Sequence, residues 1–420
     1  MNDAKRTFLI AVLIACPCAF ALASDKVAPT LKPEFEVDVR GTLLTPESVG
    51  ASADDYFLVH AGTRVRVLSV RDGKPLGATT TEFDNPPSWI KGDDKSFVLA
   101  TPFAITGHRL EGEPLTWSIA QSDRQGHQDP EDNNPIRQIV STGDQLVAMF
   151  DDGTVMRLQV ADDAPVWQQT LGPKPAGGLV IVEDAMTYLT RTNRGESIHI
   201  LDARTGEQRS VYEVPKGDSV LDQFPGESIT MLRVLDGFIG VGSQTGQQQW
   251  RIGGHSRLPE GHAAADANGI YASVDGQQVV KFSRETGERL WRFEGVGVKP
   301  PARVTLSVCD RFLLVRGESF VQVIDATNGA SLGRIECLNR EQIASTKFVG
   351  NVLRVLVKPA RKESIWRLEE LRSLQKGATE SKDAHYFLQP FANFKNAIML
   401  GDVLIIHDGD RLIGFDLSSN

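Results

Sequence analysis

The sequence predicts an all-β fold, a β-propeller of about eight four-stranded blades within a range of seven to nine. The first observation is residues 279–293, VVKFSRETGERLWRF, in which two β-rich runs flank a polar turn that contains Gly287. Glycine accepts the positive φ that closes such a turn, so this pattern is typical of a β-hairpin. The second observation is that the hairpin recurs along the chain with a period of about 40 residues. The third is a tryptophan at nearly the same place after several turns.

Most repeats contain two recognisable strand runs. The turn glycines of the hairpins are Gly73, Gly112, Gly206, Gly246, Gly287 and Gly329. A further apolar run precedes most of the hairpins, at residues 56–60, 97–100, 146–150, 186–190, 270–274, 312–315 and 403–407. Four short strands in each repeat are typical of propeller blades, and we expect residues 24–420 to form a single propeller domain.

The tryptophans predict how neighbouring blades pack. Trp250 and Trp291 each follow a turn glycine by four residues, and Trp117 and Trp167 occupy nearly the same place in their repeats. A large ring at one register would give each blade a flat surface against the next. We therefore interpret these residues as structural.

Two irregular regions affect the number of blades. Nine hairpin signals are present, but the copies near Glu113 and Glu370 are the weakest, so we interpret them as elaborations within blades and expect eight. Residues 363–376 would also suit a helix, but they fall where the repeat expects a hairpin. We interpret them as a degraded hairpin.

The two ends of the repeat array predict how the ring closes. The chain stops after residues 412–417 without a final outer strand, whereas residues 34–44, EFEVDVRGTLL, form a spare strand at the other end. We expect this spare strand to complete the C-terminal blade, because pairing it there removes the exposed sheet edges of an open array.

Residues 1–23 have the pattern of a secretory signal peptide, with Lys5 and Arg6 before an apolar run at residues 8–15. Two cleavage sites remain open. Cleavage after Ala23 would release a periplasmic or secreted protein. Residues 13–16, LIAC, resemble a lipobox, and lipidation of Cys16 would instead tether the protein to a membrane. We expect no transmembrane span, since the apolar run is too short.

After cleavage at Ala23, only Cys309 and Cys337 remain. The repeat pattern places them at opposite ends of non-adjacent strands in one blade, beyond disulfide reach, so two free thiols are expected. The formal net charge of −9 argues against nucleic acid as a partner.

The turn sequences resemble a known family. LDARTGE at residues 201–207, RETGERLW at 284–291 and IDATNG at 324–329 are similar to the repeat of quinoprotein-like (PQQ-type) β-propellers. The resemblance implies one of two branches. One comprises quinone-dependent dehydrogenases with Ca²⁺ on the axis, and many of its alcohol dehydrogenases carry an adjacent cysteine pair. The other is cofactor-free and includes the lipoprotein scaffold of the outer-membrane β-barrel assembly machinery.

This chain resembles the cofactor-free branch more. The sequence after residue 23 lacks an adjacent cysteine pair and a compact acidic cluster suited to Ca²⁺. His255 and His262 match no metal-binding spacing, so we interpret their loop as polar structure. The acidic pairs at residues 151–153 and 408–410 fit hairpin turns. The long polar stretch at residues 121–137 could serve recognition or be a solvated insertion.

These patterns predict an exported, non-catalytic, monomeric binding or assembly scaffold with a protein or peptide partner in the cell envelope. We expect no catalytic, cofactor-binding or metal-ligating residues and no cofactor. The alternative is a periplasmic oxidoreductase with a quinone or another small ligand on the propeller axis.

Overall fold

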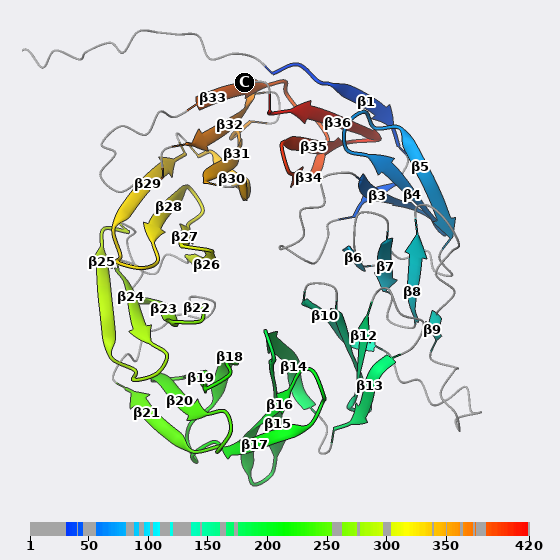
Figure 1. Ribbon diagram of the computed structural model, residues 1–420. Helices are drawn as coiled ribbons and strands as arrows, with labels where there is room; N and C mark the ends of the chain where they lie inside the picture. Colours follow the sequence, from blue (N-terminus) through cyan, green and yellow to red (C-terminus); the bar gives the residue numbers. More distant parts are fainter. Residues whose placement is uncertain are drawn as a thin grey trace, which may run out of the picture.

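The structure, a computed structural model, is a ring of β-sheets around a central axis (Figure 1). The described residues are 31–39, 41–44, 56–80, 88–91, 96–100, 104–109, 118–120, 136–142, 145–159, 165–171, 175–253, 263–274, 278–296, 304–337, 340–349, 351–361, 364–372, 374 and 384–418. Within them, 36 strands form nine four-stranded antiparallel sheets. The predicted all-β propeller is confirmed, and its nine blades lie at the upper end of the expected range.

The blades are numbered 1 to 9 along the chain, and their strands are given from the axis outwards. Blades 1 to 3 are β2 (Thr42–Leu43), β3 (Tyr56–Ala61), β4 (Arg64–Ser69) and β5 (Pro75–Thr80); β6 (Ser88–Lys91), β7 (Ser96–Ala100), β8 (Ala104–Arg109) and β9 (Ser118–Ala120); and β10 (Ile136–Thr142), β11 (Gln145–Phe150), β12 (Thr154–Gln159) and β13 (Pro165–Thr170). Blades 4 to 6 are β14 (Pro175–Val182), β15 (Ala185–Thr192), β16 (Gly195–Asp202) and β17 (Gln208–Glu213); β18 (Val220–Phe224), β19 (Ile229–Val234), β20 (Gly237–Gly242) and β21 (Gln248–Ile252); and β22 (Ala263–Ala265), β23 (Gly269–Val274), β24 (Gln278–Ser283) and β25 (Arg289–Glu294). Blades 7 to 9 are β26 (Thr305–Cys309), β27 (Phe312–Arg316), β28 (Phe320–Asp325) and β29 (Ser331–Glu336); β30 (Gln342–Val349), β31 (Val352–Lys358), β32 (Trp366–Leu371) and β33 (Ala384–Leu388); and β34 (Phe394–Leu400), β35 (Val403–Asp408), β36 (Arg411–Asp416) and β1 (Phe35–Asp38).

The strand runs found in the sequence are the second and third strands of the blades. In blade 5, every residue of β19 and β20 is buried. Such strands are paired on both edges and covered on both faces, so they read as continuous apolar runs. The weak hairpin copies are not elaborations: β8 and β9 belong to blade 2, and β32 and β33 belong to blade 8, which raises the count from eight to nine. Within the predicted degraded hairpin at residues 363–376, the described part contains strand β32 and no helix, as expected.

The N-terminal strand closes the ring as predicted. β1 pairs antiparallel with β36, from Phe35 opposite Gly414 to Asp38 opposite Arg411. One detail differs, because the end of the predicted spare strand forms β2, the inner strand of blade 1. The ring of Phe35 also lies against Gly73 in blade 1, where an added Cβ would be 2.7 Å from it. The closing strand therefore packs against the next blade as well.

The tryptophans join neighbouring blades. Trp250 of blade 5 donates an Nε1–H hydrogen bond to the Arg284 carbonyl in the turn of blade 6, at 2.9 Å. Its ring also covers Gly287, whose φ is +71° and whose missing Cβ would be 2.8 Å from the indole. The same arrangement links Trp291 to Ala326 and Gly329, and Trp167 to Ala203 and Gly206. The predicted packing role is confirmed for these three tryptophans, and Trp117 lies outside the described residues.

The structure describes the two cysteines but not the N-terminal signal sequence. Cys309 ends the inner strand of blade 7 and Cys337 follows its outer strand, and both thiols are free, as expected. The signal sequence and Cys16 lie outside the described residues. Among the residues that the structure describes, no helix is long and apolar enough to cross a membrane.

Candidate functional site

The inner strands begin at one end of the ring, which we call the start face; the second strand of each blade ends there. Several inner strands carry a bulge near this end. The register skips one residue in β10, β18, β30 and β34. In β14 the skip is wider, between Pro175 and Leu179. A bulge bends a strand and redirects its side chains, so the axial ends of these blades are shaped differently from their regular outer parts.

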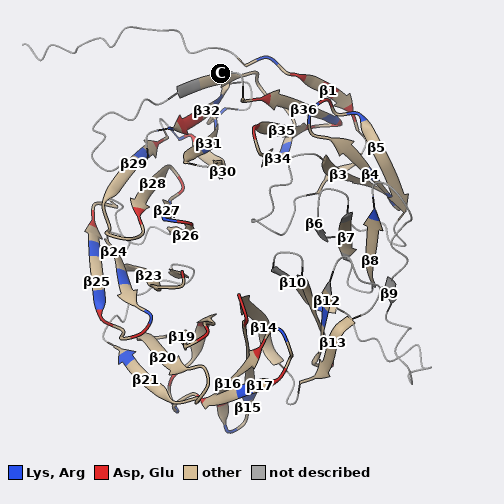
Figure 2. Ribbon diagram, viewed as in Figure 1, with Lys and Arg blue, Asp and Glu red and all other residues tan. Residues whose placement is uncertain are grey.

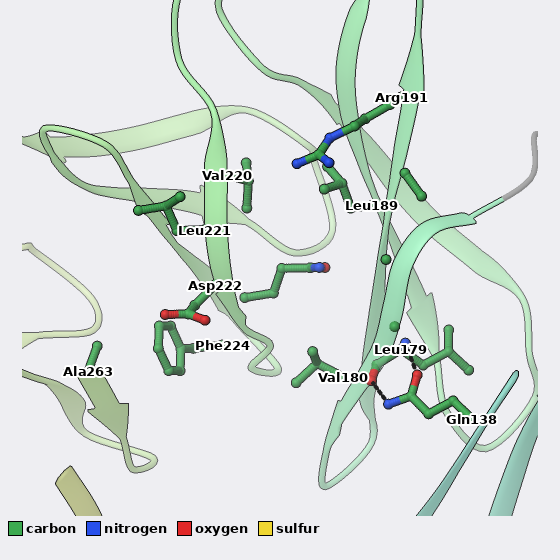
Figure 3. Close-up of a pocket in the computed structure, with 14 residues that line it drawn as sticks. Gln138, Leu179, Val180, Leu189, Arg191, Val220, Leu221, Asp222, Phe224 and Ala263 are labelled. Atoms are coloured by element: carbon green, nitrogen blue, oxygen red, sulfur yellow. Dashed lines mark hydrogen bonds between the residues drawn. The ribbon is translucent and has the colours of Figure 1, made fainter. Parts of the chain in front are cut away.

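A pocket of about 460 Å³ lies among these strand ends, and we call it the axial pocket (Figure 3). Its lining comes from the inner strands of four consecutive blades and from β15. The lining residues are Gln138, Ala176, Gly177, Gly178, Leu179, Val180, Leu189, Arg191, Val220, Leu221, Asp222, Gln223, Phe224 and Ala263. The volume is within the range of sites that enclose small molecules or side chains.

Gln138 fixes one wall of the axial pocket. Its Nε2 donates to the Leu179 carbonyl at 2.9 Å, and its Oε1 accepts from the Leu179 N–H at 2.5 Å, as the dashed lines of Figure 3 show. The side-chain amide of Gln138 thus forms with Leu179 the pair of hydrogen bonds that the backbone of a neighbouring strand would otherwise form. Arg137 adds a hydrogen bond to the Pro175 carbonyl at 2.8 Å. Blade 3 therefore supports the irregular start of β14 through side chains.

The two glycines of β14 have different surroundings. A Cβ on Gly178 would meet Gln138 Oε1 at 2.6 Å, so a side chain there would displace the amide clamp. A Cβ on Gly177 would meet no atom within 4 Å. The backbone at Gly177 is therefore open to close approach by another chain, whereas Gly178 is required by packing.

The charges at the axial pocket are already paired. Glu196 accepts from Arg191 Nε at 2.7 Å and from the Val220 N–H at 2.9 Å, so it joins blades 4 and 5 at the mouth. Asp222 forms an ion pair with Arg233 at 2.6 Å, and the Arg233 side chain is buried. In Figure 3, Asp222 and Phe224 lie on the side opposite Leu179 and Gln138.

The described groups of the axial pocket are suited to binding a polypeptide. Nucleophilic catalysis needs a nucleophile beside a base, and the described residues of the lining include no His, Cys, Ser, Thr, Tyr or Lys. It does contain aliphatic side chains, open backbone at Gly177 and a buried Gln223 Oε1 without a hydrogen-bond partner. An unsatisfied acceptor beside an accessible strand suits a peptide N–H.

Of the candidate stretches from the sequence, the structure describes the end of the polar stretch 121–137, where Arg137 supports β14, and the two acidic turns. His255, His262 and the polar stretch 121–135 lie outside the described residues. The acidic pairs form turns as expected: Asp152 accepts from the Thr154 N–H at 2.8 Å, and Asp408 accepts from the Asn393 N–H at 2.6 Å. Among the described residues, no group of three or more His, Cys, Asp or Glu could hold a metal ion.

The residues that line the axial pocket were not predicted from the sequence. They lie mainly on inner strands such as PAGGLVIV in β14 and AAA in β22, which lack clear alternation. A usable signal was the Gly-Gly pair inside an otherwise apolar run, since glycine in a strand often marks a bulge or the close approach of another backbone.

Residues 235–419 match the sequence model of a family described as outer membrane protein assembly factor BamB. The matched stretch begins in blade 5 and extends through blade 9. The predicted resemblance to PQQ-type propellers of the assembly-factor kind is confirmed over this stretch. No curated protein sequence matches the chain.

Three solved structures illustrate the fold. A eukaryotic initiation factor is 13% identical, covers 85% of this chain and 91% of its own, and has a TM-score of 0.56. The computationally designed protein Ika8 is 14% identical, with coverage of 77% and 96% and a TM-score of 0.52. BamB from Moraxella catarrhalis is 14% identical, with coverage of 78% and 96% and a TM-score of 0.45. The first two show a common fold alone, and the third score is too low to carry an argument.

Proposed function

We propose that this chain is a non-catalytic scaffold of the cell envelope that binds an extended segment of another protein in its axial pocket. The observation that carries the proposal is the match of residues 235–419 to the outer membrane assembly factor family. The chemistry of the axial pocket supports it, because amide, glycine and aliphatic groups recognise a peptide without transforming it.

The geometry suits a rigid binding platform. Nine blades joined by buried strands and interblade tryptophans hold the inner strands in fixed positions. A peptide that enters the axial pocket could approach the backbone at Gly177, where an added Cβ would meet no atom within 4 Å. Binding to a preformed site avoids the entropic cost of ordering the scaffold.

The envelope location is part of the same proposal. The signal pattern of residues 1–23 directs export, and the chain then remains in the periplasm, is secreted, or is tethered through Cys16. Mass spectrometry of the purified N-terminus distinguishes these forms, because cleavage after Ala23 leaves Ser24 first, whereas lipidation leaves an acylated Cys16. An intact, uncleaved N-terminus in the native host would contradict export by this signal.

The binding role is tested by crosslinked capture from envelope extracts with quantitative mass spectrometry. Gly177→Trp should fill the axial pocket without a clash, because the site is open, and should reduce recovery of a specific partner by about tenfold or more. Gly77→Trp is the matched control. Gly77 is equally open, but it lies on β5, the outer strand of blade 1, and does not line the axial pocket.

The results of this capture experiment test the position of the binding site and the scaffold function separately. Equal recovery with both variants would exclude the axial pocket as the binding site, and the absence of any specific partner for the unaltered chain would contradict the scaffold role. The oxidoreductase alternative makes a different prediction: pyrroloquinoline quinone with Ca²⁺ would raise the melting temperature and support dye-linked dehydrogenase activity. We expect neither effect.

A further inference from the structure

A second pocket, of about 580 Å³, lies at the start face between blades 8 and 9, and we call it the cationic pocket. It is formed by the turns that precede β30 and β34, the end of β31 and the start of β32. Its lining residues are Arg340, Gln342, Lys358, Pro359, Ala360, Arg361, Trp366, Phe391, Ala392, Asn393, Phe394 and Lys395. None of these residues lines the axial pocket.

Among the described residues, the lining holds four cations and no carboxylate: Arg340, Lys358, Arg361 and Lys395. This is unusual in a chain with a formal net charge of −9, whose ribbon shows both signs interspersed around the ring (Figure 2). Lys395 is 4.0 Å from Asp410, and within the described residues the other three cations form no ion pair. Within the described part of the chain, the cationic pocket therefore has a local excess of positive charge over paired carboxylates.

Nearby carboxylates are occupied elsewhere. Glu341 accepts from Arg367 at 2.6 Å, and the buried Asp408 accepts from the Asn393 N–H and from Arg411. Closer approach of either acid to the cationic pocket would break these contacts. Arg340, Lys358 and Arg361 thus remain available to an external anion, whereas Lys395 already has a long contact with Asp410.

Two of the four cations lie at backbone irregularities. Lys395 is the extra residue of the bulge in β34, where the register skips from Phe394 to Asn396. Arg340 has a φ of +69° directly before β30, a conformation that non-glycine residues adopt rarely. Both irregularities occur at the residues that carry charge, which is typical of a functional surface.

The inner part of the cationic pocket is aromatic. The rings of Trp366 and Phe394 are 4.3 Å apart, and those of Trp366 and Phe391 are 5.6 Å apart. Trp366 is 1% exposed, and its Nε1 has no hydrogen-bond partner among the described residues. A buried indole N–H normally has an acceptor, so this orphan donor is a second sign that a ligand belongs here.

We propose that the cationic pocket binds an acidic peptide segment that carries an aromatic or large apolar side chain. Carboxylates would pair with the cations at the mouth, and the apolar side chain would contact the partly buried Phe394, whose ring packs against the buried Trp366. A single inorganic anion would leave most of the volume and the aromatic wall unused. The inference rests on the proposed scaffold function, since it names the chemistry of a segment that such a scaffold would hold.

The experiment measures fluorescence anisotropy of a labelled synthetic peptide, GDEFEDG, with the purified mature chain. The double variant Lys358→Gln/Arg361→Gln should weaken binding by about tenfold, because it removes two exposed ion pairs. The control Arg64→Gln/Arg66→Gln removes two exposed arginines of β4 in blade 1 and should leave binding unchanged. Circular dichroism melts verify that both variants fold.

The peptide chemistry is varied in parallel. GNQFQNG, which lacks the charges, and GDESEDG, which lacks the aromatic ring, should each bind at least tenfold more weakly than GDEFEDG. Equal binding of GNQFQNG, or equal loss in the Arg64/Arg66 control, would overturn the proposal. Binding of phosphatidylglycerol vesicles or inorganic phosphate in place of the peptide would assign the pocket to a lipid headgroup or a free anion and would also overturn it. Partner capture that depends on Gly177 but persists in Lys358→Gln/Arg361→Gln would leave the scaffold function standing without this inference.

Discussion

The guanidinium of Arg284 in blade 6 donates to the backbone carbonyl of Ile229 in blade 5, at 2.9 Å. The same side chain reaches the carbonyls of Phe224, Pro225 and Asp266. Arg284 is 5% exposed, and burial lowers its pKa. Carbonyl dipoles of two blades thus stabilise this buried cation. Blades 4 and 7 have an alanine, Ala203 or Ala326, at the turn position that Arg284 occupies in blade 6.

Replacing this cation should weaken the ring. We expect Arg284→Met to lower the free energy of unfolding by about 3 kcal/mol, because several buried carbonyls lose their donor while the apolar stem is kept. Urea unfolding followed by tryptophan fluorescence measures the change. Arg289→Met on the exposed surface of β25 is the control, and an equal effect of the two variants would contradict a structural role for the Arg284 contacts.

The interblade tryptophans predict an order of stability. Trp250→Phe removes the donor of the Arg284 carbonyl, for which the described residues offer no second donor. Trp291→Phe leaves the Ala326 carbonyl with Lys281 Nζ at 3.1 Å. We expect Trp250→Phe to be more destabilising by about 1 kcal/mol. Paired urea titrations measure this difference, and the reverse order would refute the argument from the carbonyl.

His108 should make the protein sensitive to mild acid. It contacts Thr79 and Thr106 through its two ring nitrogens, and burial lowers its pKa from 6.5 to about 4. The unfolded chain therefore takes up a proton first, so the contribution to stability is complete above pH 6.5 and is lost as the pH falls toward 4.

The measurement compares unfolding free energies at pH 7 and pH 4.5 for the unaltered chain and His108→Gln. After allowance for solvent screening, we expect the loss between these pH values to be about 1–2 kcal/mol smaller in the variant. Identical pH profiles would show that His108 does not contribute to the acid sensitivity.

Cys337 should be slow to alkylate in the folded protein. Burial, together with Glu341 and Glu369, raises the pKa of its thiol to about 11. Because the thiolate is the reactive form, iodoacetamide at pH 8 should modify native Cys337 about 100-fold more slowly than the unfolded chain. Peptide mass spectrometry follows both cysteines. Rapid native modification would contradict the buried setting, and fewer than two reactive thiols in the unfolded mature chain cleaved after Ala23 would contradict the absence of a disulfide.

The sequence predicted the parts of the fold that are buried on both faces. Residues 146–150 and 312–315 were recognised because β11 and β27 lie between two paired neighbours and pack against adjacent blades. The hairpin turns were recognised because glycines with positive φ, such as Gly287 and Gly329, are required there. The local chemistry of these elements is the same in each blade, so repetition revealed it.

The pockets could not be predicted in the same way. The inner strands have one unpaired edge toward the axis, and their side chains are only partly buried, as in β18 and β22. Their sequences are therefore under weaker packing constraints and differ between blades. Lys395 and Arg340 are separated by 55 positions in the sequence. They line the same pocket because blades 8 and 9 are neighbours in the ring.

From the pairing of β1 with β36 we expect the ring to close late in folding. The ion pair between Glu36 and Arg411 joins residues that are 375 positions apart, whereas each blade is completed within a short stretch of chain. Such a long-range contact forms slowly, so the intervening blades can assemble before the ring is sealed. Until then, β36 presents an open strand edge that the β1 of another copy could occupy. Two chains that exchange this one strand would form an intertwined dimer, and dilute refolding is the condition that favours the closed monomer.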